Sequence, residues 1–296
     1  MKIRPKHLNK GDTVGIIALS GPVEMEKLQD KIRVLEELDL RVKLGQTIGL
    51  AEGYLAGSDT ERVEDLHQMI EDPEVKAIFC MSGGYGAARI ADQIDYPLLS
   101  ENPKIFWGFS DATYLHIAFH QYSNIVTFHG PNLPSEMNEQ TKKMFYQLFL
   151  PFEIHYDETI SPLETIIPGS VRGELIGGNL RRMVDTLGTK FEVDTRGKIL
   201  LLEEVGETLE NIDCMLNQLR LSRKLEQASG FAIGSFVGVS REEVFALMNE
   251  YLKPYNKPVL AGFEIGHAET NVGIPLGVEV ILDADEKALR ILPGVE

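Results

Sequence analysis

The chain has 296 residues, of which 43% are hydrophobic and 25% are charged, a composition typical of a globular protein with a buried core. Its 45 acidic and 29 basic residues give a formal net charge of -16 at pH 7. This negative charge repels phosphate backbones and anionic membranes, so we expect neither nucleic-acid nor membrane binding.

The cysteines and the N-terminus indicate the compartment. Cys80 and Cys214 lie far apart and fit no Cys-x-x-Cys pattern, so we expect free thiols. The first residues lack the apolar core of a signal peptide, and no stretch reaches the roughly 18 apolar residues of a membrane-spanning helix. We therefore expect a cytoplasmic protein.

The first half of the sequence alternates strand-like and helix-like segments. Short apolar runs predict strands, and apolar residues spaced three or four apart predict helices. In chain order, the expected strands are Thr13–Leu19, Arg41–Leu44, Val75–Met81 and Lys104–Trp107, and the expected helices are Glu24–Leu38, Asp59–Glu71, Gly86–Gln93 and Ala112–Tyr122. This alternation predicts a parallel sheet with helices on both faces.

The pattern changes near residue 150, where three prolines punctuate a stretch of weak periodicity that we interpret as a linker over 151–170. Beyond it, the expected strands are Ser170–Ile176, Lys198–Glu203, Phe231–Val239, Pro258–Ile265 and a closing hairpin of Val278–Asp283 and Ala288–Ile291. The expected helices are Asn179–Leu187, Asn211–Leu221 and Glu242–Tyr251. We predict an α/β protein with an N-terminal parallel-sheet domain over 1–150 and a smaller β-rich domain over 171–296.

The segment Gly108-Phe109-Ser110-Asp111 separates a predicted strand from a predicted helix. A serine on a sharp strand-to-helix turn exposes its hydroxyl, and the first N–H groups of the helix can bind an oxyanion. Serine and aspartate are also ordinary N-cap residues, so the segment alone indicates either a nucleophile or a helix cap.

A nucleophilic serine requires a base, and histidine is the usual one. His129 and His267 each follow a predicted strand, and the sequence pattern does not choose between them. His116 and His120 lie four apart on a predicted helix, but the glutamate of a His-Glu-x-x-His zinc site is missing. We interpret these two as packing residues and expect no metal.

Acidic residues and glycine clusters complete the set of candidates. Glu203 and Glu204 end an apolar run, and strand alternation would turn one toward a site and the other toward solvent. The segments 82–86 and 173–180 are rich in glycine and permit close backbone approach. Neither fits a dinucleotide or Walker A pattern, so we expect no nucleotide cofactor.

Taken in order, these motifs resemble the LD-carboxypeptidase family of serine peptidases, the group that also contains the microcin-immunity hydrolases. The resemblance extends over nearly the whole chain. Its matching segments are Lys10–Ala18, Tyr54–Asp59 with Arg62, Gly83–Gly86, Gly108–Thr113, His129–Pro131, Gly177–Leu180, Leu202–Glu207 and Gly262–His267.

The resemblance implies a Ser-Glu-His triad formed by Ser110, Glu203 and His267. In this assignment the serine attacks a carbonyl carbon, the histidine takes and returns the proton, and the glutamate orients the imidazole. The oxyanion hole implied by the resemblance consists of backbone N–H groups at Gly83, Gly84 and Asp111.

The resemblance also implies a fold and a substrate. The N-terminal domain would resemble class I glutamine amidotransferases and be followed by a smaller β-rich domain. The enzyme would be a cofactor-free, cytoplasmic homodimer that releases terminal D-alanine from a small peptide, a peptidoglycan tetrapeptide, in peptidoglycan recycling. Two alternatives stay open: hydrolysis of peptidyl- or aminoacyl-nucleotides, and a non-enzymatic module that binds a small anion.

Three positions depart from the family pattern. Leu19 replaces a proline, while Ser82 and Cys214 stand where an arginine is common. If an arginine normally steadies a substrate carboxylate or a loop, Arg89 or Arg220 is a candidate to replace it. We interpret the single tryptophan, Trp107, as a core residue rather than a base-stacking one.

Overall fold

The computed structural model describes residues 2–133 and 139–296. The chain divides into two compact units: unit 1 comprises Met1–Phe152, Gly273–Pro275 and Pro293–Glu296, and unit 2 comprises Glu153–Val272 and Leu276–Leu292. Within the described residues, no helix combines the length and apolar character that crossing a membrane requires.

The segment 151–170, expected as a linker, contributes strands β6 (Ile154–Tyr156) and β7 (Glu164–Ile167) to unit 2. These strands lie at the two edges of their sheet. Edge strands tolerate nearby prolines because one side makes no ladder hydrogen bonds, which explains why this segment resembles a linker in sequence.

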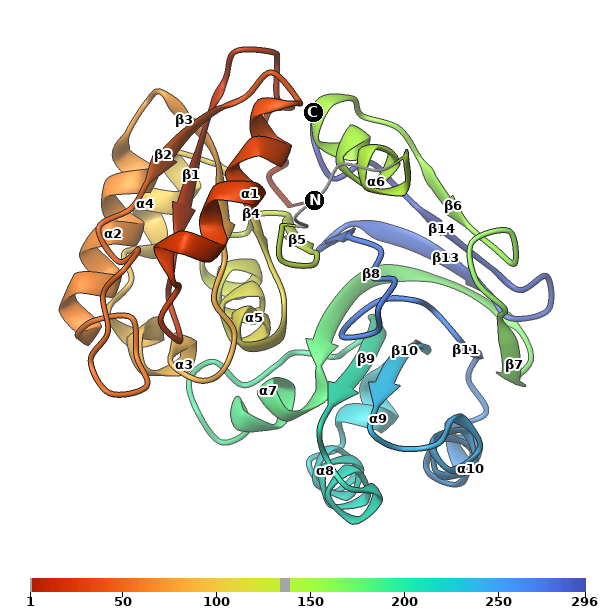
Figure 1. Cartoon of the computed structure of the whole chain (residues 1–296). Helices are drawn as coiled ribbons and strands as arrows, with labels where there is room; N and C mark the ends of the chain where they lie inside the picture. The colour runs from red at the N-terminus through yellow and green to blue at the C-terminus, as the bar shows by residue number, and fades with distance from the viewer. Residues whose placement is uncertain (1, 134–138) are drawn as a thin grey trace. The chain divides into compact units, whose positions relative to one another are not determined.

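Unit 1 contains a six-stranded sheet with the order β12-β5-β4-β3-β1-β2 (Figure 1). The strands are β1 (Thr13–Ile17), β2 (Arg41–Leu44), β3 (Val75–Cys80), β4 (Ile105–Gly108), β5 (Thr127–His129) and β12 (Ile274–Leu276). Strands β1 to β5 pair in parallel, which confirms the predicted parallel sheet. Their carboxyl ends therefore share one edge, where ligands bind in open α/β sheets.

The helices of unit 1 connect these strands. They are α1 (Met25–Glu36), α2 (Asp59–Glu71), α3 (Ala87–Ile90), α4 (Tyr96–Glu101), α5 (Thr113–Tyr122) and α6 (Glu139–Phe149), with 3-10 turns η1 (Ala91–Gln93) and η2 (Ser110–Ala112). Helix α2 begins with a capping box between Ser58 and Glu61, which fixes its first turn. Helix α4 has no clear signal in the sequence, because six residues carry too little periodicity.

The two faces of the sheet pack against different helices. On one face, Gly15 lies against Met69 of α2, and Phe106 packs edge-on against Phe119 of α5 at 5.0 Å between ring centres. On the opposite face, Phe79 packs against Phe145 of α6. The sheet is therefore covered on both sides, as the alternation of strands and helices predicts.

Trp107 is buried in the core of unit 1, as expected. Its ring packs against Phe145 at 5.3 Å, and its Nε1 donates a hydrogen bond to the carbonyl of Pro131 at 2.8 Å. A Cβ atom at Gly130 or Gly273 would lie 2.1 or 2.3 Å from this ring. Only glycine fits at these two positions, because a methyl group would overlap the indole.

Unit 2 contains an eight-stranded mixed sheet with the order β6-β14-β13-β8-β9-β10-β11-β7. Its remaining strands are β8 (Ser170–Asn179), β9 (Ile199–Val205), β10 (Gly230–Val237), β11 (Val259–Ala261), β13 (Glu279–Asp283) and β14 (Ala288–Ile291). Strands β8 to β11 are parallel, and the flanking strands are antiparallel. Its helices are α7 (Leu180–Asp185), α8 (Leu209–Leu221), α9 (Lys224–Gln227) and α10 (Arg241–Leu252), followed by η3 (Lys253–Tyr255).

His116 and His120 on α5 are buried and bonded to neighbouring strands. His116 Nε2 donates to the carbonyl of Gly108 at 2.9 Å, and His120 Nε2 lies 2.9 Å from the Thr127 hydroxyl. Complete burial lowers the pKa of His116 to about 4. Its imidazole is therefore neutral at pH 7 and connects the end of β4 to α5.

Replacing His116 with glutamine should reduce the acid sensitivity of the fold. The unfolded histidine binds a proton below about pH 6.5 while the folded one does not, so the free energy of unfolding falls as the pH drops from about 6.5 to 4. This group contributes at most about 3 kcal/mol to that loss. Urea unfolding of both proteins across this range measures the difference, and equal pH slopes would contradict the prediction.

Candidate active site

Ser110 has a left-handed backbone at the carboxyl end of β4. Phe109 is extended, Ser110 has a φ of 58°, and α5 follows after η2. A non-glycine residue in this region costs about 1–3 kcal/mol and is concentrated at functional sites. Neither η2 nor α5 receives a side-chain cap hydrogen bond, so the geometry resembles a nucleophile turn rather than the helix cap that the sequence left open.

The glycine turn (residues 82–86) lies next to the Ser110 hydroxyl. It follows β3, which neighbours β4 in the parallel sheet. The Cβ position of Gly83 is 3.8 Å from Ser110 Oγ, and Gly84 has a φ of 102°. The backbone of this turn can therefore come close to a group bonded to the serine, which an oxyanion hole requires.

The side chain of Asp111 fixes the surroundings of the serine. It is fully buried, and its Oδ2 accepts hydrogen bonds from Ser20 Oγ at 2.6 Å and from the N–H of Ala87 at 2.8 Å. Ser82 accepts a hydrogen bond from the N–H of Ser20 at 2.9 Å. The side chain of Asp111 and the hydroxyl of Ser82, which joins two loops, are functional features that the sequence pattern does not indicate.

Arg62 also bonds to these two loops. This fully buried guanidinium donates from Nη1 to the carbonyls of Leu19 at 2.6 Å and Gly86 at 2.9 Å, and forms an ion pair with Asp59. Arg89 binds Asp59 through two further hydrogen bonds, which lower the pKa of that carboxyl. Arg89 is therefore engaged in supporting this network, while Arg220 bonds to Asn217 on its own helix.

Glu203 and His267 form a hydrogen-bonded pair in unit 2. The Nδ1 atom of His267 lies 2.6 Å from Oε2 of Glu203, which is fully buried on β9. Burial raises the pKa of Glu203, and the hydrogen bond from His267 partly offsets this. Nδ1 is bonded to the carboxylate, and in a catalytic triad the other ring nitrogen, Nε2, is the one that exchanges a proton with the reacting group.

His267 does not follow a strand directly, contrary to the predicted strand Pro258–Ile265. Strand β11 ends at Ala261, where the backbone turns at Gly262 with a φ of 95°; only glycine fits there, because a Cβ atom would lie 2.3 Å from the carbonyl of Pro162. The N–H groups of Gly262 and Phe263 both donate to the carbonyl of Ile233 instead of continuing the ladder. His267 therefore lies in the loop that follows β11.

Glu204 does not face solvent, which corrects the expectation from strand alternation. It is buried, and its carboxylate accepts hydrogen bonds from Asn179 Nδ2 at 2.9 Å and from the N–H groups of Arg181 at 2.8 Å and Val205 at 2.9 Å. Alternation does turn Glu203 and Glu204 to opposite faces, but helix α7 covers the second face. Glu204 is thus a structural residue that joins β9 to the start of α7.

The two candidate bases occupy different environments. His129 is fully buried at the end of β5, with its ring edge-on to Phe109 at 6.2 Å and 6.3 Å from the ring of His116. His267 contacts the carboxylate of Glu203. In residues 2–133 and 139–296, no three His, Cys, Asp or Glu side chains gather as metal ligands would.

The two cysteines differ in exposure. Cys80 is buried at the end of β3, and burial raises the pKa of its thiol to about 11, which keeps it protonated and unreactive at neutral pH. Cys214 is exposed on α8. Cys80 therefore does not supply the activated thiolate that nucleophilic catalysis uses.

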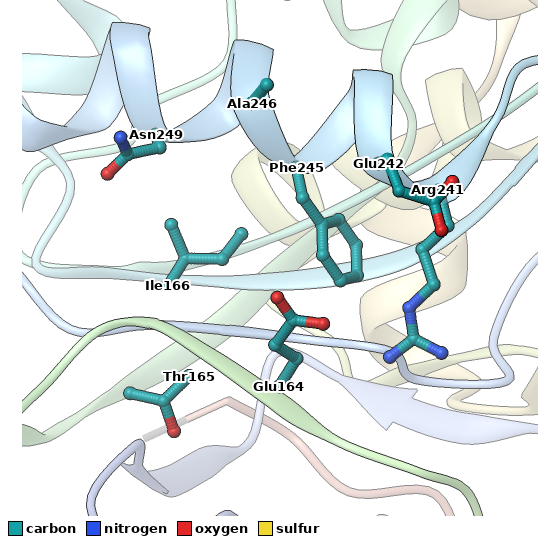
Figure 2. Close-up of a pocket in the computed structure, with 8 residues that line it drawn as sticks. All are labelled: Glu164, Thr165, Ile166, Arg241, Glu242, Phe245, Ala246 and Asn249. Carbon is teal, nitrogen blue, oxygen red and sulfur yellow. The ribbon is translucent and has the colours of Figure 1, made fainter.

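A groove of about 510 Å³ lies elsewhere in unit 2, between β7 and α10 (Figure 2). Figure 2 shows Glu164 and Thr165 below it and Phe245 and Asn249 above it. The Arg241 guanidinium lies 4.9 Å from the centre of the Phe245 ring and donates to the carbonyl of Pro162. Neither Glu203 nor His267 lines this groove, so it is separate from the acid–base pair.

Comparisons with known proteins agree with these features. Residues 14–130 match the model of the LD-carboxypeptidase N-terminal domain, and residues 172–282 match that of the LD-carboxypeptidase C-terminal domain. A Bacillus subtilis (strain 168) protein named "Probable murein peptide carboxypeptidase" is 45% identical, with 100% of this chain and 96% of that protein covered. The murein tetrapeptide carboxypeptidase of Pseudomonas aeruginosa PAO1 is 29% identical, with 92% and 93% covered.

A crystal structure of an MccF-like protein from Bacillus anthracis str. Ames matches the fold with a TM-score of 0.91 and 26% identity, with 98% of this chain and 99% of that chain covered. These matches span both units of the chain. The protein therefore belongs to the LD-carboxypeptidase family of serine-type carboxypeptidases.

Proposed function

We propose that this protein is a carboxypeptidase in which Ser110 is the nucleophile, His267 the general base and Glu203 the residue that orients the imidazole. The observation that carries the proposal is the 2.6 Å hydrogen bond between His267 Nδ1 and the buried Glu203 carboxylate. A buried carboxylate bonded to an imidazole fixes its tautomer and stabilises the imidazolium that forms when the serine loses its proton. The left-handed backbone of Ser110 supports its assignment as the nucleophile.

The reaction follows from these roles. As Ser110 Oγ forms a bond to the carbonyl carbon, His267 Nε2 accepts the hydroxyl proton. The imidazolium then donates this proton to the leaving amine as the carbon–nitrogen bond breaks. Water attacks the acyl-enzyme by the same route, releases the shortened peptide as a carboxylic acid and regenerates the serine.

Backbone N–H groups of Gly83, Gly84 and Asp111 are the proposed donors to the oxyanion. The closeness of the Gly83 backbone to Ser110 Oγ supports this assignment. The donors need to be fixed before the reaction, and the buried bonds of Asp111 and Arg62 hold the loops that carry them. Loss of one such donor typically costs about 3 kcal/mol of transition-state stabilisation.

The proposed substrate is a small peptide with a D-amino acid at its carboxyl terminus, and the proposed reaction is release of D-alanine from a peptidoglycan tetrapeptide. The names of the two carboxypeptidase relatives support this choice. We also propose that the enzyme is a cytoplasmic homodimer, as the family resemblance implies. Its role would then be peptidoglycan recycling.

Purified protein should release D-alanine from a muropeptide tetrapeptide, measured as the loss of one alanine by mass spectrometry. A matched tetrapeptide that ends in L-alanine should stay intact, because the proposed enzyme cleaves an L-to-D bond. An unchanged D-alanine tetrapeptide after prolonged incubation would contradict the proposed substrate.

The alternative substrate is a peptidyl- or aminoacyl-nucleotide, which the resemblance to the microcin-immunity hydrolases implies. The same triad chemistry would apply, with a different leaving group or acyl part. Incubation with an aminoacyl-nucleotide conjugate separates the two proposals. The peptide should have the higher kcat/KM if the first proposal is correct, and the conjugate should have it if the alternative is correct.

Replacement of Ser110 with alanine should lower kcat by about a thousandfold or more, because the nucleophile is removed while binding remains. A fluorophosphonate probe should label the wild type at Ser110 and fail to label the variant. Labelling should also fall strongly in His267→Ala, whereas Ser222→Ala, at the end of α8, should label normally. Equal labelling of the wild type and Ser110→Ala would exclude this nucleophile, and no labelling of any form would favour an anion-binding module.

Replacement of Glu203 with glutamine should stabilise the fold at neutral pH and impair catalysis. Burial raises the pKa of Glu203 in the folded protein. The stability that this group contributes is therefore present at low pH and is lost as the pH rises, because ionisation leaves a buried charge at pH 7. The neutral amide removes that cost, so the free energy of unfolding should rise on the order of 1 kcal/mol, while kcat falls about a hundredfold or more. Urea unfolding and kinetics measure both effects.

Glu204→Gln is the matched control for this variant. Its carboxylate accepts hydrogen bonds from Asn179 and two backbone N–H groups, and an amide replaces one accepting oxygen with a donor. We expect this variant to be less stable than the wild type. A Glu203→Gln protein that is also destabilised at pH 7 would contradict the stated cost of the buried charge.

A further inference from the structure

We propose that Ser235 is a positioning residue that holds the backbone of His267 in place for catalysis. The inference rests on the proposed function, because it assigns a supporting residue to the proposed base. Ser235 lies on β10, where the pairing with β9 changes register between Ile233 and Phe236. Such bulges often redirect a side chain beside a functional site.

The Ser235 hydroxyl is fully used by one short stretch of chain. Its oxygen accepts hydrogen bonds from the N–H groups of His267 at 3.0 Å and Ala268 at 3.2 Å, and it donates to the carbonyl of Ile265 at 3.2 Å. A hydroxyl has one hydrogen to donate and two lone pairs to accept with, so these three bonds exhaust its capacity. The N–H of Ser235 also donates to Ile265, at 2.9 Å.

His267 is therefore held at two points from adjacent strands. Glu203 on β9 binds the imidazole ring, and Ser235 on β10 binds the backbone. The loop after β11 has no regular ladder to fix its backbone, so its N–H groups depend on partners of this kind. With both points fixed, the position and the orientation of the ring are set together.

Gly266 makes this close arrangement possible. Its φ is 124°, and a Cβ atom there would lie 2.5 Å from Glu203 Oε2 and 2.7 Å from Ser235 Oγ. Asn271 closes the loop by accepting a hydrogen bond from the N–H of Gly266 at 3.1 Å and donating to its carbonyl. The loop thus approaches both anchoring side chains more closely than any residue with a side chain would permit.

Removal of the Ser235 hydroxyl should affect the chemical step more than the fold. The N–H groups of His267 and Ala268 are only partly buried, so water can replace the lost acceptor. A general base that is misplaced by about 1 Å can slow catalysis about a hundredfold. Ser235 contacts the loop backbone rather than reacting atoms, so its loss should change kcat and leave substrate binding nearly intact.

The test compares Ser235→Ala, Ser235→Thr and Ser235→Val in the full-length protein. Threonine keeps the hydroxyl and valine is its apolar isostere, so the pair separates hydrogen bonding from shape. We expect kcat to fall about tenfold to a hundredfold in the alanine and valine variants, with KM within about twofold, and to recover in the threonine variant. Ser222→Ala, whose hydroxyl bonds only within its own helix end, should retain wild-type kcat.

A second readout does not depend on turnover. The proton between His267 Nδ1 and Glu203 should give a downfield NMR signal, and its assignment is checked by its loss in Glu203→Gln. In Ser235→Ala this signal should broaden or shift, because the ring is no longer held at a fixed distance, and Ser235→Thr should restore it. These changes would support the positioning role even if the wild type cleaved none of the peptides tested, which would contradict only the proposed function.

Three results would overturn the inference. The first is a wild-type kcat and NMR signal in Ser235→Ala. The second is equal kcat in Ser235→Thr and Ser235→Val, because the hydroxyl would then have no specific effect. The third is a parallel loss of kcat and cooperative unfolding in both the alanine and the threonine variants, which would show that Ser235 supports the fold in general.

Discussion

The left-handed backbone of Ser110 is the constraint on which unit 1 depends. This conformation is unfavourable for a residue with a side chain, so it persists only where both neighbours are fixed. On one side, Gly108 is held by the ladder of β4 and by the hydrogen bond from His116. On the other side, the buried carboxylate of Asp111 is bonded to Ser20 and Ala87. The strain at the serine is thus maintained by interactions that the serine itself does not make.

The buried charged groups of this region, Arg62 and Asp111, bind the backbone and side chains of the surrounding loops. Arg62 donates to two loop carbonyls, and Asp111 accepts from a loop hydroxyl and a helix N–H. Removing charges from water is costly unless each polar atom finds a partner, and a network of this kind can specify one arrangement of loops rather than add net stability. The result is that the loops after β1 and β3 are joined beside the serine before any substrate arrives.

The sequence predicts elements better than it predicts contacts. Strand and helix periodicity locates β2 and α2 at their observed bounds, because each has a clear pattern and α2 has a capping box. The end of β11 and the environment of Glu204 are missed, since both depend on what packs against them: the carbonyl of Pro162 at Gly262, and helix α7 over Glu204. Ser235 is missed because a lone serine in an apolar strand carries no signal until its distant partners are known.

In both units, a nearby glycine and a serine hydroxyl support the candidate site residues. In unit 1, Ser110 follows β4 and its Oγ is near the Cβ position of Gly83, and in unit 2, Glu203 lies on β9 and its Oε2 is near the Cβ position of Gly266. A supporting hydroxyl comes from a neighbouring element in each unit: Ser20 donates to the Asp111 carboxylate, and Ser235 accepts from the N–H of His267. A Cβ atom at Gly266 would overlap both Glu203 and Ser235, so even a small substitution there should be hard to accommodate, whereas one at Gly83 would make an ordinary contact with Ser110. The positions of the candidate site residues therefore depend on glycines that allow close approach as well as on the side chains that form hydrogen bonds.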